Sequence, residues 1–256
     1  MKKLAAIATC LAALNCLRAT EISALNLITD FKFSSEQSTR GRKKGDKVIT
    51  SKAELWTPVF EKGKFYYGVI AVLGLDSEKA SNEISPYIGM LYLATDKFTL
   101  DAGCSHTFNT NFQEECKRDH IKRDTTEIYC GISANVLLSP SLYVFYDLDA
   151  EDLDFESFIS HTIDLANNFA LELGAKLGYR RANKPGACEK YDEAMGSKDY
   201  FYGGTTADLV YGLNEYSKLR VGAEFACNSA KRDAWANANG GHKSLLWFNA
   251  SANFSF

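Results

Sequence analysis

The chain has 256 residues, of which 46% are hydrophobic, 12% aromatic and 24% charged, and its formal net charge is −3. This charge balance gives no sign of the basic surface that nucleic-acid binding needs, and no run of 18 apolar residues is present to form a membrane-spanning helix. The 13 Tyr and 16 Phe, against only 4 Pro, favour a chain rich in β-strands.

The first 19 residues have the pattern of a cleaved secretory signal peptide. Lys2 and Lys3 precede a short apolar stretch, and the small residue Ala19 follows it. The stretch is shorter than the ~20 apolar residues that a membrane-spanning helix needs. We therefore expect export and cleavage after Ala19, leaving residues 20–256 as one domain. Removal of Lys2, Lys3 and Arg18 leaves 26 basic against 32 acidic residues.

Polar and apolar residues alternate with a period of two through much of the remaining chain, which is the pattern of strands with two different faces. Such strands cross a membrane with roughly 9–11 residues when they are tilted. The twelve predicted strands are residues 25–34, 48–57, 64–75, 85–94, 98–108, 125–137, 141–149, 155–165, 169–180, 200–213, 217–228 and 244–256.

The predicted connections alternate between short and long. Tight turns follow the even-numbered strands, at 58–63, 95–97, 138–140, 166–168 and 214–216. Longer polar or charged loops follow most odd-numbered strands, at 35–47, 109–124, 181–199 and 229–243, with the short 150–154 as the exception. Bacterial outer-membrane barrels have short periplasmic turns and long extracellular loops. The sequence therefore predicts an all-β fold, a transmembrane antiparallel up-and-down barrel of about 12 strands.

One face of the clearest predicted strands is continuously apolar. Leu171 and Leu173, for example, alternate with Glu172 and Lys176. A Lys or Arg on the lipid-facing side costs ~2–4 kcal/mol at the bilayer midplane, so the charged set is expected to face the lumen. By this parity the inward acids are Asp30, Glu54, Asp101, Glu127, Asp147, Glu156, Asp164, Glu172, Asp208 and Glu224, and the inward bases are Lys32, Lys52, Lys176, Arg180 and Arg220.

A lumen with these charges is either filled with water or closed by acid–base pairs. In the first interpretation the acidic excess favours cations and weakly polar solutes; in the second, pairs across the lumen plug it. The expected pore-lining residues are Glu127, Glu156, Glu172, Lys176, Asp208, Arg220 and Glu224.

Aromatic residues gather near the strand ends, and those that face outward are expected to form girdles at the membrane interfaces. They are Phe65, Tyr66, Tyr67, Tyr87, Tyr92, Phe155, Tyr179, Tyr200, Phe201, Tyr202, Tyr211 and Phe254.

The last predicted strand is strictly amphipathic and ends in Phe256. This ending resembles the C-terminal signature that the barrel-assembly machinery recognises in bacterial outer-membrane barrels. The resemblance implies that Phe254 and Phe256 act as the assembly signal.

Two further segments carry a resemblance. Residues Thr29-Asp30-Phe31-Lys32-Phe33, followed by Arg40-Gly41, resemble the start of a family of uncharacterised, porin-like outer-membrane barrel proteins of Gram-negative bacteria. The segments 142–147, 155–156 and 174–179 are similar to the middle of that family. The resemblance implies passive transport of small hydrophilic solutes, with outer-membrane lipids as surroundings, and it transfers no catalytic residue, cofactor or metal site.

Two other functions compete with a pore. A closed structural or adhesive barrel would act through its loops, where the basic cluster 40–44 is suited to lipopolysaccharide phosphates. A lipid hydrolase needs a Ser beside a His. Ser105 and Ser160 directly precede His106 and His161, but adjacent strand residues point to opposite faces, which disfavours catalysis.

Five cysteines lie beyond the predicted signal peptide: Cys104, Cys116, Cys130, Cys188 and Cys227. None has Cys-x-x-Cys spacing, which disfavours metal and redox motifs. A bridge between Cys104 and Cys130, and another between the loop residues Cys116 and Cys188, are conceivable in an oxidising compartment. The alternative is that they stay as thiols.

Overall fold

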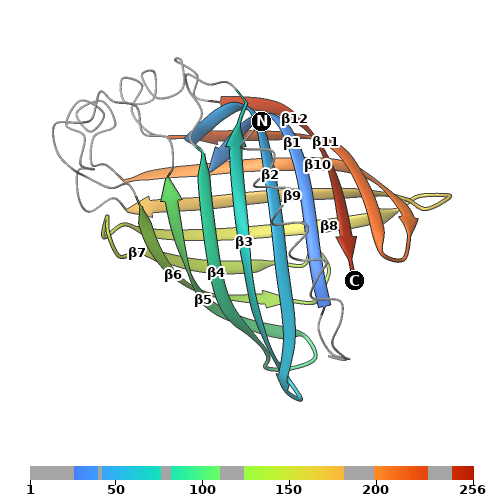
Figure 1. Ribbon diagram of the computed structural model, residues 1–256, viewed down its shortest axis with the longest axis horizontal. Helices are drawn as coiled ribbons and strands as arrows, with labels where there is room; N and C mark the ends of the chain where they lie inside the picture. The colour runs from blue at the N-terminus through green and yellow to red at the C-terminus, as the bar shows by residue number, and fades with distance from the viewer. Residues whose placement is uncertain (1–25, 40–41, 76–81, 110–123, 182–198, 230–243) are drawn as a thin grey trace, which may run out of the picture.

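The computed structural model describes residues 26–39, 42–75, 82–109, 124–181, 199–229 and 244–256. Twelve antiparallel strands form a closed barrel in these residues, and each strand pairs with its neighbours along the chain (Figure 1). The predicted all-β barrel is confirmed. The strands are β1 (Asn26–Thr39), β2 (Arg42–Phe60), β3 (Gly63–Gly74), β4 (Glu83–Leu93), β5 (Phe98–Asn109), β6 (Thr125–Ala134), β7 (Ser141–Asp147), β8 (Leu153–Asp164), β9 (Phe169–Arg181), β10 (Tyr200–Asn214), β11 (Ser217–Asn228) and β12 (Ser244–Ser255). The described residues contain no helix long and apolar enough to cross a membrane.

The barrel closes where the first strand pairs with the last. The β1–β12 register runs from Ile28 opposite Ser255 to Ser34 opposite Asn249. Leu27 and Phe256 complete the seam with reciprocal backbone hydrogen bonds of 3.0 and 2.8 Å. Closure gives the backbone groups of both terminal strands partners, which a sheet edge exposed to lipid would lack.

Tight connections lie at one end of the barrel. In Figure 1 the β8–β9 and β10–β11 turns are on the right-hand side. The β8–β9 turn uses Asn167 and Asn168 with positive φ of 57° and 65°, a conformation that Asn tolerates better than most residues. The β10–β11 turn pairs Asn214 directly with Ser217. These turns match the short connections predicted after the eighth and tenth strands.

The outward face of the wall is an exposed apolar band. Leu246 and Phe248 retain 63% and 66% of their accessible surface, and exposed Leu, Ile, Val and Phe side chains recur on β3 to β11. A face this apolar on a closed barrel is typical of contact with lipid. The alternation predicted from the sequence is therefore present in the folded wall.

The β1–β2 connection differs from the prediction. Residues 35–47 were expected to form a loop, but β1 continues to Thr39 and β2 begins at Arg42, with a register shift between Gln37 and Ser38. Pairing between β1 and β12 is recorded only as far as Ser34, so we name residues 35–39 and 42–46 the hairpin extension. The expectation was wrong because this segment pairs through its backbone and lacks alternating apolar residues.

Candidate channel lumen

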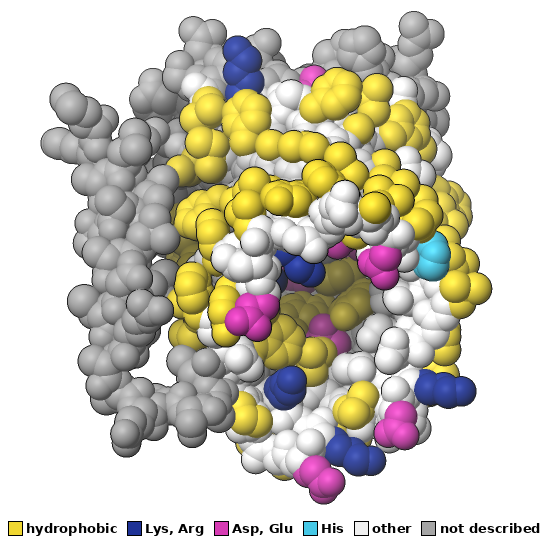
Figure 2. Space-filling view, turned by 90° about the vertical axis from the view of Figure 1, so that its right-hand side faces the viewer, with side chains coloured by type: hydrophobic (Ala, Val, Ile, Leu, Met, Phe, Trp, Pro, Cys, Tyr) yellow, Lys and Arg dark blue, Asp and Glu magenta, His cyan; other side chains and the backbone are white. Residues whose placement is uncertain are grey.

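The barrel is hollow when it is viewed from the end with the β8–β9 and β10–β11 turns (Figure 2). Lys, Arg, Asp and Glu side chains surround the opening, and side chains of the hydrophobic class, which in this view includes Tyr, line its depth. We call the concave face that carries these residues the inner face. Side chains converge on the concave face of a barrel wall, so strands that are not direct neighbours make contact there.

Ion pairs brace the part of the inner face formed by β8 to β12 and β1, which we call the paired wall. Lys32 of β1 forms an ion pair with Glu224 of β11, and the Asn249 side-chain amide donates to the same carboxylate at 3.0 Å. The Arg220 Nε of β11 donates to Glu172 Oε2 of β9 at 3.2 Å. These contacts hold four strands together by charge-assisted hydrogen bonds.

A second ionic cluster lies on β8 and β9 at the opposite end from the short turns. The Arg180 guanidinium pairs with Asp152 and, at 3.2 Å, with Asp154. Asp154 is 1% exposed, so its charge depends on this partner. The sequence placed Asp152 and Asp154 in a connection and missed their role.

Tyrosines cover the other part of the inner face, formed by β2 to β7, which we call the tyrosine wall. Asp101 accepts hydrogen bonds from Tyr66 Oη at 2.6 Å and Tyr143 Oη at 2.9 Å. The hydroxyls of Tyr66 and Tyr129 lie 2.7 Å apart. Buried Tyr hydroxyls need polar partners, and the carboxylate and neighbouring phenols supply them.

Glu54 organises the next part of the tyrosine wall. It accepts hydrogen bonds from Tyr87 Oη at 2.7 Å and Trp56 Nε1 at 3.0 Å, and its Oε1 lies 3.0 Å from Lys52 Nζ. The sequence predicted Glu54 and Lys52 to face inward, and these contacts place them on the inner face.

Each tyrosine of this wall lies across a glycine of the neighbouring strand. The cross-strand partners are Tyr66 with Gly89, Tyr87 with Gly68, Tyr129 with Gly103 and Tyr143 with Gly131. A Cβ added at Gly89 would come within 2.3 Å of the Tyr66 ring, and one at Gly103 within 2.5 Å of Tyr129 Oη. The rings therefore lie flat along the wall and do not project across the hollow.

The side-chain contacts named above run along the wall. They join strands that are neighbours or that have no more than two strands between them, as with Tyr66 on β3 and Tyr129 on β6. The interpretation of a plugged lumen expected acid–base pairs across the lumen. Pairs along the wall brace the sheet and leave the hollow between its sides.

Four of the seven predicted pore-lining residues lie together on the paired wall. Asp208 is opposite Glu172 in the register, and Glu172 binds Arg220. Glu224 lies on β11, the strand that also carries Arg220, and it binds Lys32 of β1. These four are Glu172, Asp208, Arg220 and Glu224.

Of the other three predicted residues, Lys176 lines a small cavity together with Glu224, whereas Glu127 and Glu156 lie apart from that group. Glu127 on β6 is opposite Asp147 on β7, Glu156 on β8 is opposite Gly178, and Lys176 on β9 is opposite Gly204. The structure thus brings together one acid–base group, and it adds the tyrosine wall, which the sequence did not single out. The sequence had treated Tyr66 and Tyr87 of this wall, and also the buried Tyr200 and Tyr202 of β10, only as strand-end aromatics.

The hairpin extension covers part of the paired wall. Ser38 lines a cavity of about 100 Å³ together with Phe158, Lys176 and Trp247, which belong to β8, β9 and β12. Trp247 is 4% exposed and packs with Ala226 and Leu245. The inner face is therefore narrowed on this side by a segment that leaves the wall.

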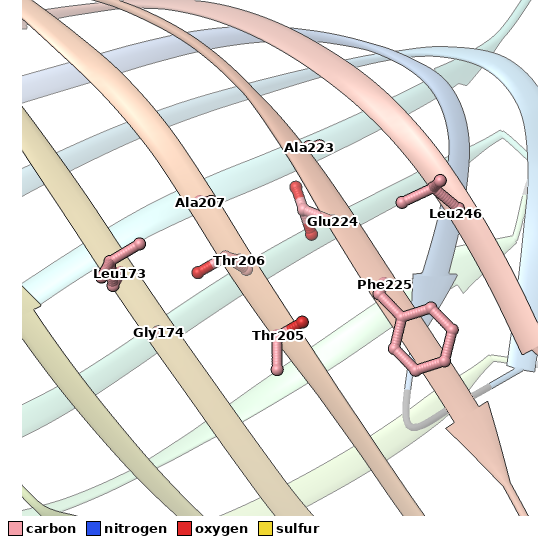
Figure 3. A pocket seen from close by; sticks show the side chains of 9 residues that line it. All are labelled: Leu173, Gly174, Thr205, Thr206, Ala207, Ala223, Glu224, Phe225 and Leu246. Carbon is pink, nitrogen blue, oxygen red and sulfur yellow. The ribbon is translucent and has the colours of Figure 1, made fainter.

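A second cavity, of about 410 Å³, is shallow and lies over β9 to β12 (Figure 3). Leu173, Phe225 and Leu246 flank the small side chains of Ala207 and Ala223 there. These five residues belong to the outward, apolar set, so the cavity is a depression over the apolar band, and Gly174, Thr206 and Glu224 of the inward set also line it.

The histidines of the described strands do not form a catalytic pair with the neighbouring serines. His106 Nδ1 contacts Thr126 Oγ1 at 2.9 Å, and its ring packs edge-on against Phe108. His161 is exposed and follows the outward parity of Ile159. Across the described ranges, no group of three or more His, Cys, Asp and Glu is placed to hold a metal ion.

Cys104, Cys130 and Cys227 are free thiols. Cys130 is opposite Ala102 and Cys104 is opposite Ile128, so the two cysteines are diagonal neighbours and the conceivable bridge between them is not formed. Cys116 and Cys188 lie outside the described residues.

Comparison with known proteins extends this description. No family model matches the chain, and no curated protein matches it. Among solved structures, the chain is similar to the KdgM porin, with a TM-score of 0.53 and 12% identity over 90% of this chain and 99% of that one. It has the fold of bacterial outer-membrane barrels.

Two other solved structures agree. The NanC porin has a TM-score of 0.54 and 10% identity over 88% of this chain and 98% of that one. LpxR from Salmonella typhimurium has a TM-score of 0.55 and 9% identity over 90% of this chain and 99% of that one. These likenesses confirm the predicted resemblance to outer-membrane barrels at the level of the fold.

Proposed function

We propose that the chain is an outer-membrane porin-like channel for passive diffusion of small hydrophilic solutes, with a mild preference for cations. The observation that carries the proposal is the closed barrel with an apolar outward face and a charged inner face around a hollow. An apolar band suits lipid, and charges suit a wet interior. Export with cleavage after residue 19, insertion by the barrel-assembly machinery through Phe254 and Phe256, and contact with lipopolysaccharide belong to the same proposal.

The direction of the ion pairs supports a pore over a plug. Charged groups that closed the lumen would have to meet from opposite sides of the barrel. The pair of Lys32 with Glu224 instead links β1 to β11, with only β12 between them. The pair of Arg220 with Glu172 links β11 to β9, with only β10 between them. Because these charges find partners within the wall, they do not require partners on the opposite side of the lumen.

The charge balance of the inner face supports the cation preference. Four of the five predicted inward bases are in ion pairs: Lys32, Lys52, Arg180 and Arg220. Pairing neutralises most of their field, whereas Asp101 and Asp208 have no ion-pair partner among the described residues. The remaining field is negative and attracts cations.

The same field disfavours polyanions. One solved structure similar to this chain is the KdgM porin in complex with disordered oligogalacturonate, with a TM-score of 0.52 and 12% identity. The acidic excess on the inner face of the present chain would repel such a ligand. We therefore propose neutral and cationic solutes for this barrel.

Liposome swelling tests the proposal. Proteoliposomes are placed in isotonic solutions of neutral sugars of increasing size and of a polyanionic oligosaccharide. We expect fast swelling with monosaccharides, slower swelling with larger sugars and the slowest with the polyanion. Swelling no faster than that of empty liposomes, from protein shown to be folded, would favour the alternative of a closed structural or adhesive barrel.

We also propose that the chain is not an enzyme. Ser105 and Ser160 belong to the inward set, whereas His106 and His161 belong to the outward set. A Ser nucleophile and its base must lie within hydrogen-bond reach of each other. Release of fatty acid from phospholipid vesicles by the purified protein would contradict this part of the proposal.

A further inference from the structure

The tyrosine wall combines two groups that recognise organic cations. The rings of Tyr66, Tyr87, Tyr129 and Tyr143 lie along the wall, and the carboxylates of Asp101 and Glu54 lie among their hydroxyls. Aromatic faces attract ammonium groups through the ring quadrupole, most strongly where water is partly excluded. Carboxylates attract the same groups by charge.

The chain already holds one ammonium group in this arrangement. Lys52 Nζ lies 5.8 Å from the centroid of the Tyr87 ring and 3.0 Å from Glu54 Oε1. The Lys52 side chain is itself an alkyl-ammonium group, so this contact shows that a carboxylate and a ring of the wall reach one ammonium together. This contact involves the part of the tyrosine wall around Glu54, which we call the Glu54 half. The part around Asp101 is the Asp101 half.

The Asp101 half of the wall has no such group. Asp101 accepts hydrogen bonds from Tyr66 and Tyr143, and no Lys or Arg of the described ranges forms an ion pair with it. An ionised carboxylate offers roughly four acceptor positions, so about two remain. The Tyr129 ring, whose hydroxyl contacts that of Tyr66, lies beside it and is tilted by 42° to the Phe145 ring with 5.9 Å between centroids.

We infer that the tyrosine wall around Asp101 binds small organic cations in transit, namely solutes with a primary or quaternary ammonium group on a carbon skeleton, in preference to inorganic cations. This rests on the proposed channel function and names its solute class. An inorganic cation gains only the carboxylate and keeps its hydration shell. An organic ammonium gains the carboxylate and the ring faces together.

The test is block of the potassium current through single channels in a planar bilayer. Choline chloride is added to symmetric KCl, and sodium chloride at the same concentration is the control. We expect choline to reduce the potassium current at a concentration where sodium does not. Potassium current without selective block by choline would overturn this inference and leave the channel proposal standing. Absence of potassium current would overturn both.

Asp101→Asn tests the carboxylate. The amide keeps an oxygen for only one of the Tyr66 and Tyr143 hydroxyls, which donate to different oxygens of Asp101, and it removes the charge. The choline concentration for half-block should therefore rise about five-fold or more. The matched control is Asp164→Asn, which removes the same charge from the exposed turn end of β8. Its half-block concentration should stay within about two-fold. Equal shifts in the two variants would mean a general charge effect and would overturn the inference.

Tyr129 tests the ring. Tyr129→Phe keeps the aromatic face and removes the hydroxyl, whereas Tyr129→Leu removes the face. We expect half-block to stay within about two-fold in the first and to rise about five-fold in the second. Both variants must still carry potassium current, which shows that they fold. An unchanged half-block in Tyr129→Leu would overturn the role of the rings, and this pair decides the matter even if Asp101→Asn does not fold.

Discussion

At the scale of single residues, the glycines beneath the tyrosines set the shape of the inner face. At Gly103 an added Cβ would meet the Ile88 carbonyl oxygen and Tyr129 Oη, each at 2.5 Å. The backbone oxygen cannot move away as a side-chain tip can. The glycine is therefore required for the tyrosine to lie flat.

Gly103→Ala should destabilise the barrel by roughly 1–3 kcal/mol, because the added methyl overpacks the site. The measurement is the urea midpoint for unfolding from lipid vesicles. Gly212→Ala is the control, since its Cβ would meet nothing nearer than 3.7 Å; it should change stability by less than about 1 kcal/mol. Equal effects in the two variants would contradict the packing of Tyr129 on Gly103.

Substitutions at the two partners of the Arg220–Glu172 ion pair should change the ion selectivity in opposite directions. If both side chains lie beside the solute path, Glu172→Gln should lower the preference for cations and Arg220→Gln should raise it, because each leaves its partner's charge uncompensated. The measurement is the reversal potential in a KCl gradient. Shifts in the same direction would place the pair away from the path.

At the scale of strands, most of the architecture was predictable. The strand predicted at 217–228 is β11 (Ser217–Asn228), and the prediction for β9 (Phe169–Arg181) ends one residue early. Every strand has one face against lipid, so an outward polar residue is costly and the period of two stays clear. The same parity assigned Glu54, Lys52, Glu172 and Arg220 to one face, and the structure shows Lys52 in contact with Glu54 and Arg220 in contact with Glu172.

The features that were missed depend on pairing between strands. The hairpin extension is held by backbone bonds that local periodicity does not record. The tyrosine wall depends on Tyr129 meeting Gly103 and Tyr87 meeting Gly68, which the register decides. Neither match is visible within a single strand, because each partner alone is an ordinary strand residue.

The hairpin extension should limit the conductance of the channel. Replacing residues 36–45 by a two-residue turn keeps Ser35, whose Oγ accepts from the Phe248 backbone N–H at 3.1 Å. We expect a larger single-channel conductance, because the segment that narrows the inner face is removed. We also expect a red shift of tryptophan fluorescence, because Trp247 becomes more exposed to water. An unchanged conductance with an unshifted spectrum would contradict packing of the extension on the paired wall.

At the scale of the whole molecule, closure of the barrel is the feature on which the lumen depends. The seam pairs Phe33 directly with Ala250. In a background with Cys104, Cys116, Cys130, Cys188 and Cys227 replaced by Ala, Phe33→Cys with Ala250→Cys should form a disulfide on mild oxidation, because directly opposite strand residues lie within bonding range.

Phe33→Cys with Phe248→Cys is the matched control for the seam, since it shifts the second cysteine by two residues along β12. A gel shift under non-reducing conditions measures the cross-link. Equal cross-linking in both pairs would contradict the β1–β12 register, and with it the closed wall.

Single-channel conductance in a planar bilayer with asymmetric KCl tests the central claim most directly. The account predicts discrete current steps and a reversal potential on the cation-selective side, which moves towards zero in Glu172→Gln and in Asp208→Asn. A folded protein that gives no steps, or steps with anion selectivity unaffected by these two substitutions, would contradict an open lumen with an acidic inner face.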